Sequence, residues 1–279
     1  MGRERYLYSD LTWPELREAI RRQPVILLPV GSVEDHGPHL PLDTDNFLAT
    51  TVCLETARRI PDDVLVMPTV PYGFNWHHID FPGTIGIAWD HFVDYMTDIT
   101  KSVAYHGFQK ILIVDGHGSN VPLVDIVARR TVMETNALCA SFIYTSLITD
   151  VAREVRESET PGGMAHACEL ETSLYLHIAG DRVVQDKIQK EIAVPSSRFI
   201  WYDLVDPSPV QMMDWWSTFS HTGVVGDPTL ATPEKGQKLF TVLIDRMVDL
   251  VGEMRARPLT ERADLHADLP VTPLLREEE

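Results

Sequence analysis

Cysteine is scarce in this sequence, and cationic side chains are outnumbered by acidic ones. The three cysteines among 279 residues, Cys53, Cys139 and Cys168, are odd in number and widely spaced. This spacing predicts neither a disulfide framework nor a CxxC zinc site, and it favours a reducing cytoplasm. The chain has 24 Lys and Arg against 41 Asp and Glu, a formal net charge of −17. We therefore expect no nucleic-acid partner and no anionic membrane partner.

Long apolar runs are also absent. No run approaches the roughly 18 residues that a membrane span needs. The N-terminal segment 1–20, MGRERYLYSDLTWPELREAI, is studded with charges and lacks the apolar core of a secretory signal peptide. Apolar residues make up 44% and charged residues 23%, which is ordinary for a globular protein. We expect a soluble cytoplasmic protein with one sizeable core.

Short strand patterns alternate with amphipathic helix patterns along the chain. The runs 24–30 and 110–115 are rich in aliphatic and β-branched residues and end in glycine-bearing turns, as buried parallel strands do. Further strand candidates are 63–70 and 140–147. Apolar residues recur at helical spacing in 46–60, 90–106, 121–135 and about 233–255. This alternation predicts an α/β domain with a mostly parallel sheet and helices on both faces.

Two segments lack this periodicity. Residues 194–232 are rich in proline, tryptophan and serine, and we expect long loops there. The polar segment 258–279 is expected to be a peripheral tail.

The segment 31–46, GSVEDHGPHLPLDTDN, is crowded with side chains that bind metal ions. Glu34 and His36 follow the first predicted strand, Asp45 precedes a predicted helix, and His117 follows the strand 110–115. Because ligands of open α/β sheets gather at the carboxyl ends of the strands, we expect these four side chains at one edge. Each has an alternative taken singly: a helix N-cap for Asp45, and solvated loop or turn positions for the others. Their convergence favours a metal site.

A second polar segment, GGMAHACELETSLYL at 162–176, supplies His166, Glu169 and Glu171. If it is helical throughout, His166 and Glu169 share a face and Glu171 points elsewhere. The alternative is a helix start decorated with acids that the macrodipole favours. Carboxylates and imidazoles without thiolates suit Zn²⁺, Mn²⁺ or Fe²⁺. A carboxylate that bridges two ions is typical of two-metal hydrolases.

These motifs resemble those of the creatininase (creatinine amidohydrolase) family. The resemblance runs from about residue 8 to 255 in the family's order, and the matching segments are LPVGSVEDHGPHLPLDTDN (28–46), YGFNWHHIDFPGTI (72–85), VDGHGSN (114–120), HACELETS (166–173) and GVVGDPTLATPEKG (223–236). It implies a single three-layer αβα domain over residues 1–257, before the tail, and assembly as a homohexamer. It also implies a dinuclear metal centre that activates a hydroxide to hydrolyse C–N bonds of amides.

The resemblance also assigns roles by position. Glu34 and His117 would hold one metal ion and His36 the other, while Asp45 would bridge the two. His166 would be the proton shuttle beside the leaving nitrogen.

The chain departs from creatinine-hydrolysing members directly after His117. Those members have a Tyr and a metal-binding Glu where this chain has Gly118 and Ser119. We therefore expect Glu169 to complete the second metal shell and Glu171 to orient His166 or a ligand. The reverse assignment of Glu169 and Glu171 stays open.

Substrate contacts are expected from three further positions. His78 matches a recurrent histidine of the family, and the backbone N–H groups around Gly118 and Ser119 are expected to stabilise an oxyanion. The family's tryptophans before the shuttle histidine are missing from 148–165, which weakens creatinine itself as the substrate.

The predicted function is hydrolysis of a small-molecule, non-peptide amide, with a cyclic amide or lactam as first choice. Two divalent ions are expected per subunit, Zn²⁺ first and Mn²⁺ or Fe²⁺ as alternatives. The alternatives are deformylation of a formamide, cleavage of a short peptide and, outside enzymology, an oligomeric binding module that keeps the fold.

Overall fold

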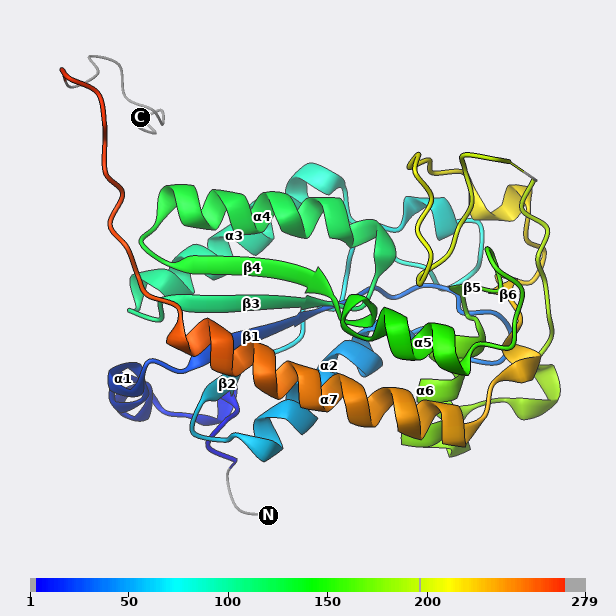
Figure 1. Cartoon of the computed structure of the whole chain (residues 1–279), viewed down its shortest axis with the longest axis horizontal. Helices are drawn as coiled ribbons and strands as arrows, with labels where there is room; N and C mark the ends of the chain where they lie inside the picture. The colour runs from blue at the N-terminus through cyan, green and yellow to red at the C-terminus, as the bar shows by residue number, and fades with distance from the viewer. Residues whose placement is uncertain (1–3, 196, 269–279) are drawn as a thin grey trace.

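A four-stranded parallel sheet forms the centre of the computed structural model, which describes residues 4–195 and 197–268 (Figure 1). The strand order is β2–β1–β3–β4, and all three pairings are parallel. Every residue of β1 and β3 is buried, as expected for central strands covered on both faces. The strands are β1 (Val25–Val30), β2 (Val64–Val66), β3 (Lys110–Asp115) and β4 (Leu138–Ile143).

Helices cover both faces of this sheet. In Figure 1, α3 and α4 lie over one face, whereas α2 and α7 lie over the other. Along β1, Val25 and Leu27 pack into the core on the α2/α7 side, and Ile26 and Leu28 pack into the core on the α3/α4 side. The helices are α1 (Trp13–Arg22), α2 (Thr44–Arg59), α3 (Trp89–Tyr105), α4 (Val121–Glu134), α5 (Thr149–Val155), α6 (Glu169–Ala179) and α7 (Pro233–Ala256).

The predicted α/β class is confirmed. Strand β2 is shorter than the predicted run 63–70, and β4 ends at Ile143 because the chain turns there into a 3-10 helix. A small antiparallel pair, β5 (Met164–His166) and β6 (Val225–Gly226), is an addition to the predicted elements. It lies beyond the carboxyl ends of the main strands (Figure 1).

The aperiodic segments follow their prediction where they are described. Apart from β6, the described part of 194–232 holds only two short 3-10 helices. Residues 258–268 are exposed and have no helix or strand, while 269–279 of the expected tail lie outside the described residues. Within the described ranges, no helix combines the length and the apolar character that crossing a membrane requires.

Candidate metal centre

The loops that follow β1 and β3 bring four side chains to one point at the carboxyl edge of the sheet. Glu34 and His36 lie beyond the end of β1, His117 lies beyond the end of β3, and Asp45 lies in the first turn of α2. Their relative exposures are 0%, 0%, 5% and 3%, respectively. Gly116 permits this approach, because a Cβ atom there would lie 2.4 Å from the backbone oxygen of Asp45.

Asp45 is the centre of this group. Its Oδ1 lies 3.0 Å from Nε2 of His36, and its Oδ2 lies 3.2 Å from Nδ1 of His117. The same Nδ1 atom lies 3.2 Å from Oε1 of Glu34. Asp45 therefore is not an N-cap: Asp43 occupies that position, and the Asp45 side chain points into the cluster.

Among the described residues, four overlapping sets of three possible ligands occur, and two of them share Asp45. In each set the ligand atoms lie within 4.8 Å of one another and all three residues are buried. The two sets are Glu34, Asp45 and His117, and His36, Asp45 and Glu171. Each of these sets has the residues to hold a metal ion, and Asp45 belongs to both.

Glu171, rather than Glu169, reaches the cluster. The segment is not one helix, because His166 ends β5 and α6 begins only at Glu169. Between them Ala167 has a φ of 49°, a left-handed conformation that turns the chain. The helical spacing of His166 and Glu169 therefore does not apply, and the expected common face of these residues is wrong.

The carboxylate of Glu169 faces a different environment. It accepts hydrogen bonds from the backbone N–H groups of Glu157 and Ser158, at 3.1 and 3.0 Å. Nζ of Lys235 lies 2.5 Å from the same carboxylate. The expected role of Glu169 as a metal ligand is thus replaced by a structural ion pair that ties α6 to α7 and to the loop after α5.

The cluster meets the requirements of a divalent cation site. Both carboxylate oxygens of Glu34, Oδ2 of Asp45 and Nε2 of His36 are buried and form no hydrogen bond of good geometry, although His36 and His117 lie within ion-pair distance of these carboxylates. Burial alone would lower the pKa of His36, but Asp45, Glu171 and Glu34 outweigh it and raise this pKa to about 10. Buried carboxylates that demand this much positive charge are the environment that a bound metal ion satisfies. Oxygen and imidazole ligands fit Zn²⁺, Mn²⁺ and Fe²⁺.

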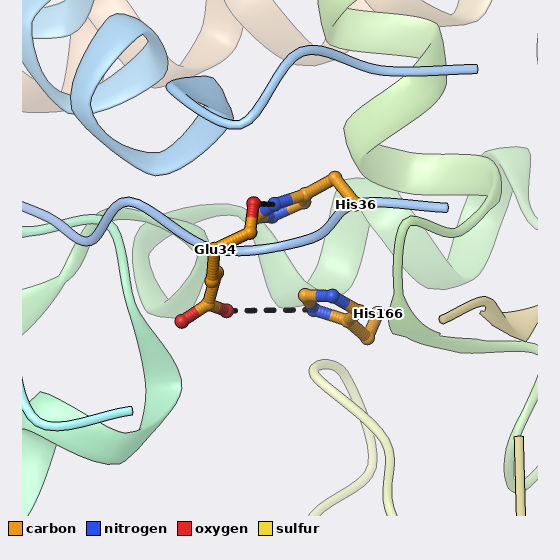
Figure 2. Close-up of side chains that lie close together, drawn as sticks. All are labelled: Glu34, His36 and His166. Carbon is orange, nitrogen blue, oxygen red and sulfur yellow. Dashed lines mark hydrogen bonds and ion pairs between the residues drawn. The ribbon is translucent and has the colours of Figure 1, made fainter. Parts of the chain in front are cut away.

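Figure 2 shows how His36 and His166 flank Glu34. Nδ1 of His36 lies 3.4 Å from the backbone oxygen of Glu34, which leaves Nε2 for the cluster. Nε2 of His166 donates to the backbone oxygen of Asp35 at 2.8 Å, and its Nδ1 faces the Glu34 carboxylate at 3.9 Å. Burial lowers the pKa of His166 to about 3, so the ring is neutral at pH 7 and its Nδ1 carries no proton.

His78 also lies at the cluster. Its Nδ1 is 2.8 Å from Oδ1 of Asp35, and its Nε2 is 3.6 Å from Oε1 of Glu34. The ring of Trp216 packs against His78 with a centroid distance of 4.8 Å. The sequence patterns did not single out Asp35 or Trp216; only the folded chain brings both to His78.

These residues lie in the floor and walls of a cavity of about 860 Å³. Gly118 and Ser119 line it beside His117, and Oγ of Ser119 lies 3.1 Å from Nε2 of His77. A Cβ atom at Gly118 would have nothing within 4 Å, so the cavity is open at this point.

Known proteins resemble this chain over most of its length. The family model described as "Creatininase: Creatinine amidohydrolase" matches residues 9–251. A mycofactocin precursor peptide peptidase of Mycolicibacterium smegmatis is 31% identical over 82% of this chain and 84% of its own length. A 3-dehydro-scyllo-inosose hydrolase of Thermotoga maritima is 27% identical over 90% and 84%. A creatinine amidohydrolase of Pseudomonas putida is 27% identical over 88% and 95%.

Solved structures share the fold. A creatininase described as the Mn form has a TM-score of 0.76 and 24% identity, covering 89% of this chain and 98% of its own. A mutant creatininase of the Zn-Zn type has a TM-score of 0.76 and 23% identity, covering 89% and 97%.

Proposed function

The chain belongs to the creatininase (creatinine amidohydrolase) family, and on this premise we propose that it is a metal-dependent hydrolase of an amide C–N bond. One observation carries the proposal: buried carboxylates and imidazoles with unpartnered ligand atoms form two sets of three that share Asp45. The relatives named above are hydrolases. A protein that only kept the fold would gain nothing from burying these carboxylates and imidazoles together.

The ligand sets suggest an assignment. Glu34, Asp45 and His117 would hold one ion, and His36, Asp45 and Glu171 would hold the other. Zn²⁺ is our first choice, with Mn²⁺ or Fe²⁺ as alternatives, and related structures of Zn-Zn and Mn forms support the first two.

When bound, the two ions would lower the pKa of a water molecule and polarise the amide carbonyl. The protein supplies the positioning and the proton transfer. His166, held by its Nε2 on Asp35, presents Nδ1 to the floor of the cavity, where it accepts a proton from the attacking water and passes it to the leaving nitrogen. Backbone N–H groups at Gly118 and Ser119 stabilise the oxyanion, and His78 contacts the substrate beside Glu34.

A small cyclic amide is the first candidate substrate. A short peptide is the second, and two observations favour it: the 31% identity to a peptide peptidase and a cavity of about 860 Å³. A homohexamer in the cytoplasm stays a prediction, as does a domain boundary near residue 257.

Metal analysis and an activity screen test the proposal together. The purified chain is loaded with Zn²⁺ or Mn²⁺, and its metal content is measured by mass spectrometry. It is then assayed against a lactam, a formamide and a short peptide. We expect two ions per chain and hydrolysis within one of these classes. A metal-free, inactive protein would instead support the binding module.

A further inference from the structure

We propose that the cavity selects amides whose group beyond the scissile bond is uncharged and apolar, and that it rejects phosphorylated substrates. The inference rests on the proposed function and specifies its substrate. It follows from the charges and the side chains of the cavity walls.

The walls offer no cationic partner to an anionic substrate group. No Lys or Arg is among the described residues that line the cavity. Two further acidic residues of the lining already have partners, since Asp125 pairs with Arg129 and Asp203 pairs with Arg156. A phosphate group extending away from the floor would therefore lose water without gaining a counter-charge.

One wall of the cavity comes from the aperiodic segment 194–232. Its apolar and aromatic side chains are Trp201, Tyr202, Met212, Met213 and Trp216, and Ser208 and Gln211 of the same segment also line the cavity. Nε1 of Trp201 donates to the backbone oxygen of Asp206, and the Tyr202 hydroxyl donates to Asp214. Since these polar atoms are paired within the segment, the two residues contribute mainly ring surface. Methionine adapts to ligands of varied shape.

The cavity has room for a group larger than a small heterocycle. Its volume is about 860 Å³, and a Cβ atom at Gly118, beside His117, would meet no atom within 4 Å. Burial of an aromatic group against this wall would add affinity through apolar area removed from water.

Three hydroxamates test the proposal, because all carry the same metal-chelating group. They are acetohydroxamate, N-acetyltyrosine hydroxamate and the O-phosphate of the latter, titrated calorimetrically into the Zn²⁺-loaded protein. We expect N-acetyltyrosine hydroxamate to bind about tenfold or more tighter than acetohydroxamate, and its phosphate ester to bind about tenfold or more weaker than the parent.

Lysine variants test whether the wall decides this preference. Met212→Lys and Met213→Lys, at positions 46% and 49% exposed, should shift the preference toward the phosphate ester by about fivefold. Met133→Lys is the matched control: Met133 is 57% exposed on α4 and does not line the cavity. It should leave the preference unchanged.

The outcomes separate the two proposals. If the protein holds two ions and binds acetohydroxamate, but binds the phosphate ester as tightly as its parent, the selectivity is refuted and the hydrolase proposal stands. Equal binding of acetohydroxamate and N-acetyltyrosine hydroxamate would also refute the selectivity and leave the hydrolase proposal standing. If Met212→Lys and Met213→Lys leave the preference unchanged, the role of Met212 and Met213 in the selectivity is refuted. A protein without metal that binds none of the three refutes both proposals.

Discussion

Two buried carboxylates at the start of α6, those of Glu169 and Glu171, lie close together in this fold but have different surroundings. At the start of α6, Glu169 is fully buried, and its oxygens are engaged by two backbone N–H groups and by Lys235. Two residues further on, Glu171 is also buried but points to Asp45 and His36, where ligand atoms lack hydrogen bonds. The first carboxylate is compensated by a buried cation of the protein itself. The second accepts hydrogen bonds from the backbone N–H and the thiol of Cys168, and it lies among the candidate metal ligands.

Burial alone does not distinguish a functional carboxylate from a structural one. When a buried carboxylate has matched donors, the protein's own groups offset much of the cost of its burial. A buried cluster with unsatisfied atoms costs stability, unless a ligand that the chain does not contain compensates it. The candidate functional site therefore differs from the structural ion pair in how well the protein's own groups pair its carboxylates, and not in how deeply they are buried.

Asp45→Asn should have the largest effect, because Asp45 belongs to both ligand sets. We expect loss of both ions, with affinity falling by more than about 100-fold, the upper range for losing even an outer partner of a metal site. Metal content after dialysis measures this. Asp43→Asn is the control, since Asp43 pairs with Arg182 on the surface; equal loss of metal in the control would point to damage of α2 instead.

His166→Gln separates the proton shuttle from the ligands. His166 has one nitrogen bonded to Asp35, and the other faces Glu34. We expect two bound ions and turnover reduced by about 10²–10⁴-fold, the usual contribution of a general acid–base group. Full turnover with a substrate found in the screen would contradict the role of His166, and loss of an ion would make it a ligand.

Glu171→Gln and Glu169→Gln form a matched pair that tests the comparison directly. Glu171→Gln should remove one of the two ions and leave the free energy of unfolding of the metal-free protein no lower than before. Glu169→Gln should keep both ions and lower this free energy by about 2 kcal/mol, because Lys235 would lose its buried partner and keep the exposed Glu157. Metal analysis and urea denaturation measure the two effects. A reversed pattern would restore Glu169 as the ligand.

The sequence predicted the sheet and most of the site because both follow from local signals. Buried strands are recognisable as aliphatic runs, and parallel strands place Glu34 and His117 at the same edge. The assignment of Glu169 and Glu171 failed for a local reason. The break between β5 and α6 at Ala167 has no glycine or proline to announce it, so helical spacing was applied across it.

Contacts between segments that lie far apart in the sequence could not be predicted from local patterns. Asp35 receives His78 and His166 from two other parts of the chain, and Trp216 comes from a segment without periodicity. Only the packing of these loops on one another brings such residues together.

The smallest predicted effect is the pH dependence of metal binding. Without metal, neighbouring carboxylates raise the pKa of His36 to about 10 and that of His117 well above its usual value, against the effect of burial. At pH 7 both rings therefore hold a proton, which a cation must displace. We expect release of about two protons when both sites fill, and apparent affinity that rises about tenfold per pH unit for each proton displaced. Calorimetry in two buffers of different ionisation enthalpy measures the number. Metal binding without proton release would mean that the cations bind elsewhere, because filling these two sites requires both imidazoles to be neutral.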